Sequence, residues 1–80
     1  MVYQINFENY QGETFLELYH HKENAYTRMR RLREENKNQE EFYSESLDEI
    51  EFFDPYYNEF PTYITLMAFN SVENLFEDTL

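Results

Sequence analysis

The N-terminal part of the chain alternates between apolar and polar positions with a period of two. Residues 2–7 place Tyr3, Ile5 and Phe7 on one face of a strand and polar side chains on the other. The same alternation returns in residues 14–19, and the only glycine of the chain lies in the polar segment between the two runs. A turn glycine between two alternating runs predicts an antiparallel hairpin.

The next segment changes to a helical period. Ala25, Met29 and Leu32 recur at positions i, i+4 and i+7, which predicts an amphipathic helix of about 14–17 residues with a narrow apolar stripe. Four arginines flank this stripe, two on each side: Arg28 and Arg31, and Arg30 and Arg33. We interpret them as pairing with the acidic second half of the chain. A partner contact and phosphate binding are the alternatives.

Residues 39–54 fit two descriptions. A helix would begin at Ser44 or Ser46, whereas a strand would use the alternation of Ile50 and Phe52 with glutamates. We favour a loop or short turn followed by a strand over residues 49–53. Two prolines then bracket a connector, because the residue before a proline is kept out of the helical region.

Residues 62–69, TYITLMAF, form the clearest strand pattern. They are apolar on both faces, which predicts a central place in the sheet. Ser71 resembles the N-cap of a short C-terminal helix. Together the patterns predict one α+β domain over residues 1–80. Its small antiparallel sheet, made of the N-terminal hairpin plus C-terminal strands, packs against one amphipathic helix.

Charge is distributed unevenly along the chain. The net charge is −11; all six Lys and Arg lie within residues 22–37, and residues 38–80 hold eleven carboxylates and no basic residue. Such a field repels nucleic acid and anionic membranes and attracts basic protein surfaces. We therefore expect a basic protein partner, no direct nucleic-acid binding and no membrane binding.

The sequence contains no signature of catalysis or of cofactor binding. It has no Cys, no Walker loop, and no GxGxxG, GxSxG or HExxH motif,. The histidines His20 and His21 are adjacent, so their side chains diverge, and we interpret them as a solvated junction. We predict that the chain is not an enzyme and holds no cofactor or metal. No leader or membrane span is recognisable, so the expected location is the cytoplasm.

Carboxylates and aromatic rings are interleaved from residue 40 to residue 60. Because unmixed charge repels itself, an ordinary solvated face mixes signs, so this segment is our candidate binding surface, with rings as anchors. We expect Phe52, Phe60 and Tyr63 to lie mostly inside, and two neighbouring tyrosines to be partly exposed. The candidate partner-binding residues are Glu40, Glu41, Glu45, Asp48, Glu49, Glu51, Asp54, Tyr56, Tyr57 and Glu59.

In size, in charge concentrated in residues 38–80, and in acid–aromatic interleaving, the chain resembles small acidic inhibitors made by phages and mobile elements. These include anti-CRISPR proteins, anti-restriction proteins and uracil-DNA glycosylase inhibitors. The resemblance implies a nucleic-acid mimic that occupies a basic nucleic-acid-binding groove of a host enzyme, such as a CRISPR effector, in the host cytoplasm. It rests on no motif, so it assigns no residue a role. The alternative is a structural or regulatory protein that forms homo-oligomers or an antitoxin-like complex with a basic partner.

Overall fold

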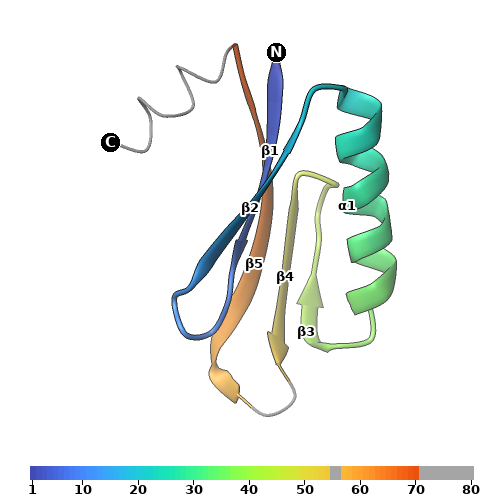
Figure 1. The fold of residues 1–80 in the computed structure, drawn as a ribbon. Helices are drawn as coiled ribbons and strands as arrows, with labels where there is room; N and C mark the ends of the chain where they lie inside the picture. Colours follow the sequence, from blue (N-terminus) through green and yellow to red (C-terminus); the bar gives the residue numbers. More distant parts are fainter. Residues whose placement is uncertain (55–56, 71–80) are drawn as a thin grey trace.

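The computed structural model describes residues 1–54 and 57–70, and within these the side chains outside residues 57–59. One helix and five strands follow in the order β1 (Val2–Glu8), β2 (Thr14–Tyr19), α1 (Lys22–Asn36), β3 (Glu40–Tyr43), β4 (Glu49–Asp54) and β5 (Tyr57–Phe69). The strands form one antiparallel sheet in the order β2-β1-β5-β4-β3, so β2 and β3 are its edges (Figure 1). The predicted C-terminal helix lies outside the described residues.

The hydrophobic core lies between α1 and one face of the sheet. Ile5, Ile50 and Ile64 from the three central strands meet Met29 and Leu32 from α1. These two helix residues belong to the apolar stripe that the sequence predicts, and the 15-residue length of α1 agrees with the prediction. Burying such side chains contributes about 1.5–3 kcal/mol each, so this layer is what holds α1 to the sheet.

The central position predicted for the TYITLMAF strand is confirmed. β5 pairs with β1 on one side and with β4 on the other. It begins at Tyr57, earlier than predicted, because Pro61 does not end it. The register with β4 shifts between the Phe52–Thr62 and Asp54–Tyr57 pairs, and an irregularity of this kind tolerates a residue without an N–H donor.

In residues 39–54 the structure selects the strand over the helix. β4 covers the strand predicted around residues 49–53, but β3 was not predicted. The register of β3 slips by one residue between Glu40 and Tyr43, and Glu41 in between has φ 50°. A bulge of this kind breaks the period of two, so the sequence pattern could not indicate β3.

The arginines of α1 make contacts other than those predicted. Arg28 pairs with Glu17 of β2 through two hydrogen bonds of 3.0 and 3.2 Å, so pairing with the acidic half is wrong for this residue. Arg33 does reach residues 38–80, but it donates to the backbone carbonyl of Ser44 at 3.1 Å. A neutral donor adds the second contact: the Tyr26 hydroxyl donates to a carboxylate oxygen of Asp48 at 2.6 Å. Hence α1 holds the β3–β4 turn largely without ion pairs.

Two of the three expectations about aromatic burial are wrong. Phe52 is buried as predicted, but Phe60 and Tyr63 are 62% and 41% exposed. Tyr63 is the cross-strand partner of Glu8 and Glu51 rather than of the core residues, so its side chain lies on the face opposite α1. The rings that were expected to fill the core are therefore available at the surface.

Candidate functional site

The face of the sheet opposite α1 carries no helix among the described residues. Directly paired residues of an antiparallel sheet share a face, so the register sorts each strand into core-facing and outward residues. The outward set includes several large hydrophobic side chains that are 41–52% exposed: Leu16, Leu18, Tyr43, Tyr63 and Met67. At one end of the same face Val2, Gln4 and Phe69 are buried. We call the exposed remainder of this surface the open face.

Four outward residues form a row across four neighbouring strands. Glu8 of β1 pairs with Tyr63 of β5, Tyr63 pairs with Glu51 of β4, and Glu51 pairs with Tyr43 of β3. Carboxylate and phenol therefore alternate along the row, which we call the acid–tyrosine row. Because neighbouring strands are about 4.8 Å apart, the Cα atoms of its two glutamates are separated by about 10 Å.

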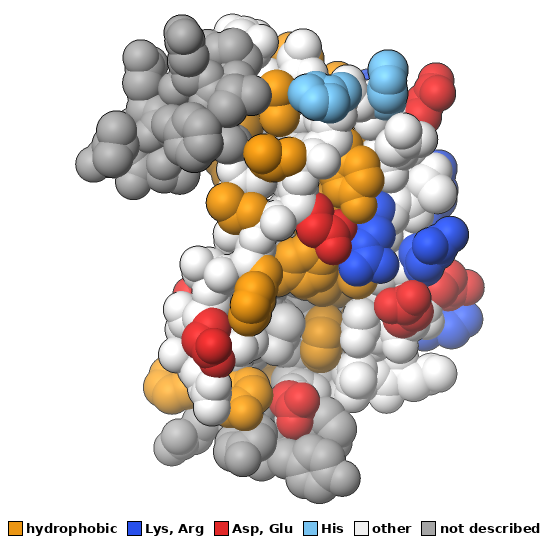
Figure 2. Space-filling view, viewed as in Figure 1, with side chains coloured by type: hydrophobic (Ala, Val, Ile, Leu, Met, Phe, Trp, Pro, Cys, Tyr) orange, Lys and Arg blue, Asp and Glu red, His pale blue; other side chains and the backbone are white. Residues whose placement is uncertain are grey.

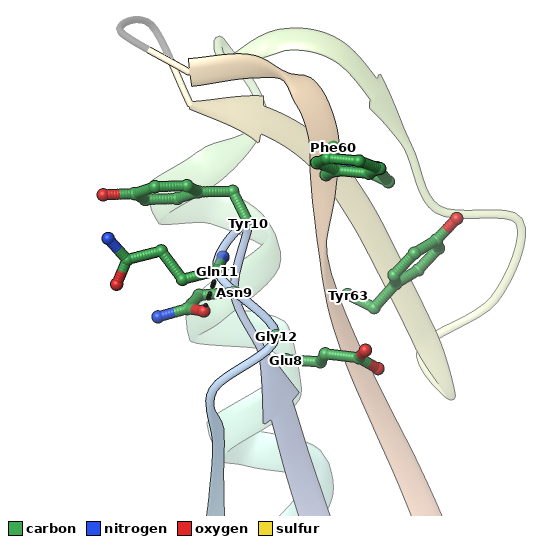
Figure 3. A pocket seen from close by; sticks show the side chains of 8 residues that line it. Glu8, Asn9, Tyr10, Gln11, Gly12, Phe60 and Tyr63 are labelled. Carbon is green, nitrogen blue, oxygen red and sulfur yellow. Dashed lines mark hydrogen bonds between the residues drawn. The ribbon is translucent and has the colours of Figure 1, made fainter.

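A cavity of about 310 Å³ opens at the Glu8 end of the row. It lies between the β1–β2 turn and β5, and Figure 3 shows Glu8 and Tyr63 side by side with Phe60 farther along β5. The turn is ordered by Asn9, whose side-chain oxygen accepts from the backbone N–H groups of Gln11 and Glu13, both at 2.9 Å. The same turn supplies Tyr10 to the cavity lining. The rings of Phe60 and Tyr63 and the carboxylate of Glu8 thus border one open hollow, whereas the Tyr10 ring points away from them (Figure 3).

A smaller hollow of about 80 Å³ lies on the other side of Tyr63. Its lining includes Tyr43, Glu49 and Glu51 from β3 and β4. Tyr63 belongs to both linings, so its ring separates the two hollows. A side chain of a partner that enters either hollow would contact this ring and a carboxylate.

Nearby carboxylates create a negative potential around the two tyrosines of the row, and this potential helps to raise the pKa of both phenols. Partial burial raises the pKa of Tyr63, and the negative charges of Glu51 and Glu8 raise it further. The pKa of Tyr43 is raised chiefly by its hydrogen bond to Glu45, 3.1 Å long, and then by surrounding carboxylates. Both phenols stay protonated at neutral pH. The row therefore offers carboxylate acceptors and ring faces, a combination that suits a guanidinium or ammonium group.

The structure distributes the ten predicted binding residues over several elements. Glu49 and Glu51 lie on the open face, and Glu51 belongs to the row. The others lie at the β3 edge (Glu40 and Glu41), in the β3–β4 turn (Glu45 and Asp48), at the end of β4 (Asp54), or at the start of β5 (Tyr57 and Glu59, whose side chains are not described). Tyr56 is outside the described residues. The structure therefore brings together only part of the predicted set.

Four residues of the site lie outside the predicted binding set: Glu8, Tyr43, Phe60 and Tyr63. A signal existed for Tyr63, because it alternates with the apolar residue Ile64, which is buried. Glu8 lies at the end of the N-terminal strand pattern, far in sequence from the other three residues of the row. Only the register between β1 and β5 places it beside Tyr63, and no sequence periodicity contains that information.

The basic residues lie elsewhere on the molecule. Figure 2 shows the Lys and Arg side chains on the right, over α1, and hydrophobic side chains exposed over the sheet. Arg30, Arg33 and Lys37 line a separate groove of about 350 Å³ with Glu34, Phe42 and Leu47, and Glu34 pairs with Lys37 at 3.0 Å. The basic residues of α1 and the acid–tyrosine row therefore lie on opposite faces of the sheet.

The described residues show no further candidate chemistry. His20 and His21 are exposed where β2 leads into α1. Within residues 1–54 and 57–70, no three side chains of His, Cys, Asp or Glu are grouped so as to hold a metal ion. No helix in the same ranges is long and apolar enough to cross a membrane.

The chain was compared with protein-family models, with curated proteins and with solved structures. None of the three comparisons gave a match. A functional proposal therefore depends on the residues and geometry of this chain.

Proposed function

We propose that this protein is a binding module that docks a basic protein surface on the acid–tyrosine row. The observation that carries the proposal is the row itself, in which Glu8, Tyr63, Glu51 and Tyr43 alternate on a face that no helix of the described residues covers. The five strands contain no Lys or Arg at all. A basic partner would therefore meet no repulsive charge anywhere on the sheet.

The row favours arginine over other side chains. A guanidinium group can donate two parallel hydrogen bonds to Glu51 or Glu8 while its plane stacks on the Tyr63 ring. A cation over an exposed ring adds about 0.5–1 kcal/mol. The separation of the two carboxylates, about 10 Å, allows two basic side chains to bind at once. Phe60, at the cavity, supplies apolar contact for the stems of these side chains.

The partner class that fits best is a host enzyme with a basic nucleic-acid-binding groove. Such a groove presents several Arg and Lys side chains in rows that match phosphates, and a chain of net charge −11 is drawn to it electrostatically. The protein would then act as an inhibitor that occupies the groove in place of nucleic acid. The resemblance to small acidic phage inhibitors makes CRISPR effectors the first targets to test, with the host cytoplasm as the place of action.

The first test is a titration with nona-arginine peptide, followed by NMR. We expect the backbone amides around Tyr63 and Glu51 to shift, and the double variant Glu51→Gln/Tyr63→Ala to bind about tenfold more weakly, since it removes a charge-assisted hydrogen bond and a ring. Glu35→Gln is the matched control, because it removes one exposed carboxylate from α1. Equal weakening by Glu35→Gln would show that only net charge matters and would overturn the assignment of the row.

The second test addresses the enzyme target. Purified CRISPR effectors and restriction endonucleases are assayed for DNA cleavage with wild-type protein, with the double variant and with Glu35→Gln. Inhibition that added substrate DNA relieves, and that the double variant loses, is the expected result. If the protein binds the peptide but inhibits none of these enzymes, the proposal of a binding module stands, and the proposal that its target is a nucleic-acid-binding groove is rejected.

The groove on α1 supports a second candidate function. Arg30, Arg33 and Lys37 line it together with one carboxylate, Glu34, so this predominantly basic groove of one copy could accept the acidic surface of another and build a homo-oligomer. The same acidic surface could instead hold a basic protein in an antitoxin-like complex. Both assemblies would weaken as salt increases, because their contacts join opposite charges.

A further inference from the structure

The outer edge of β2 is unpartnered in the described part of the chain. β2 ends the strand order and pairs only with β1, through six successive residue pairs without a register shift. Alternate backbone N–H and C=O groups of such a strand point away from the sheet and can pair with another chain. Within the described residues, β2 is therefore a regular strand with one side free to pair.

The two edges of the sheet differ in how they resist pairing. β3 is only four residues long and is bulged at Glu41, whose φ is 50°. Short length, a bulge and carboxylates are devices that protect an edge from further strands. β2 has six residues, no proline, no lysine and an uninterrupted register. One edge is thus blocked, whereas the other is open to pairing.

β2 also exposes apolar side chains on both of its faces. Phe15, Leu16 and Leu18 are 57%, 52% and 49% exposed. Leu16 and Leu18 lie on the open face, because they pair with Asn6 and Gln4, while Phe15 pairs with the core-packed Phe7 on the other face. An edge strand with this much exposed apolar surface is a site of association.

Charge decides which partner fits this edge. The only charged side chain of β2 is Glu17, which the Arg28 guanidinium neutralises. A second copy, itself at −11, would be repelled by the acidic side of the sheet but not by β2. If two copies paired through β2, their β4 strands would be seven strand spacings apart, about 33 Å, which exceeds the Debye length of about 8–10 Å in physiological salt.

We propose that β2 pairs antiparallel with β2 of a second copy, which joins the two sheets into one ten-stranded sheet, five strands from each copy. The contact is self-complementary, as a two-fold dimer requires. Leu16 and Leu18 of both copies meet on the open face, where cross-strand apolar pairs add to the backbone hydrogen bonds. The acid–tyrosine row stays accessible at the far side of each sheet, so this proposal stands apart from the proposed function.

Sedimentation equilibrium of the full chain tests the dimer. We expect twice the monomer mass of 10.0 kDa for the wild type, and dimerisation at least about tenfold weaker for the double variant Leu16→Lys/Leu18→Lys, since lysine on an edge opposes pairing. Met67→Lys is the matched control, because Met67 is 51% exposed on the open face of the central strand β5. Circular dichroism verifies that each variant is folded.

Three results would overturn the proposal: a wild type that stays monomeric up to millimolar concentration, dissociation by Met67→Lys as strong as by the double variant, or a dimer that dissociates as salt increases. The last result would indicate the acid–base packing described above instead. For the β2 dimer, added salt leaves the association constant unchanged or increases it, because screening reduces the remaining repulsion between copies. Slower hydrogen exchange of β2 amides at high protein concentration provides a readout that needs no variant.

Discussion

Glu41 is a residue whose backbone conformation is costly for its side chain. Its φ of 50° places it in the left-handed region, which costs an L-residue about 1–2 kcal/mol relative to glycine. The conformation gives β3 its bulge, and the bulge separates Glu40 from Tyr43 by one extra residue. The strain therefore has a structural consequence: it protects the β3 edge and places Tyr43 beside Glu51 in the acid–tyrosine row.

We predict that Glu41→Val lowers the free energy of unfolding by about 1–3 kcal/mol, because a β-branched residue is poorly tolerated at positive φ. Glu41→Gly should have little effect or stabilise by up to about 1 kcal/mol, since relief of strain is offset by the flexibility of glycine in the unfolded chain. Urea unfolding measures both. The neighbouring variant Glu40→Val is the control. If it lowers the free energy of unfolding as much as Glu41→Val does, the loss does not come from the positive φ of residue 41.

At the scale of elements, the ion pair between Glu17 and Arg28 fastens the edge strand β2 to α1. The Arg28 guanidinium lowers the pKa of Glu17 from its ordinary value of 4.5, against a smaller opposing effect of burial. Both side chains are about one-third exposed, so solvent screening limits the pair to about 0–1 kcal/mol. Its main effect is to keep β2 electrically neutral.

This pair predicts a pH dependence that is specific to Glu17. Because the pKa of Glu17 is lower in the folded state, the stabilisation is fully present above its unfolded pKa of 4.5 and is lost as pH falls through the folded pKa. The variant Glu17→Gln should therefore be less stable than the wild type by up to about 1 kcal/mol at pH 7, and this difference should vanish at a pH low enough to protonate Glu17 in the folded state. Unfolding curves at both pH values measure it. If the difference in stability persists at low pH, the destabilisation by Glu17→Gln comes from altered packing rather than from the lost charge.

Elements with a regular period could be predicted from the sequence, whereas irregular ones could not. The stripe of Ala25, Met29 and Leu32 predicts α1, and the apolar TYITLMAF run predicts the central strand. β3 escaped detection because a bulge removes its alternation. The acid–tyrosine row escaped for another reason: its members come from four strands, and cross-strand register is a property of the folded sheet. Glu51 was identified by its local charge context, whereas Glu8 needed a partner 55 residues away.

At the scale of the whole molecule, the charge asymmetry and the sheet order give the two sides of the sheet different charge. Basic residues are confined to α1 and its C-terminal end, and the acid–tyrosine row is on the opposite face. Along the strand order, apolar β2 is at one edge and the acidic strands β4 and β3 are toward the other. The proposed binding surface and the proposed self-pairing edge are compatible with each other because they occupy different parts of the sheet.

This separation predicts opposite salt responses for two associations of the same chain. Between about 0.01 M and 1 M salt the Debye length falls from about 30 Å to 3 Å. The association rate with nona-arginine should then fall at least about tenfold while the dissociation rate changes less, since electrostatic steering acts on encounter. Stopped-flow mixing measures both rates. The association constant of the proposed dimer, measured in the same buffers, should stay the same or increase, because its contact is apolar and carries no unpaired charge. If salt weakened both associations to the same extent, both would depend on one electrostatic contact. The two contact surfaces would then not be separate parts of the sheet.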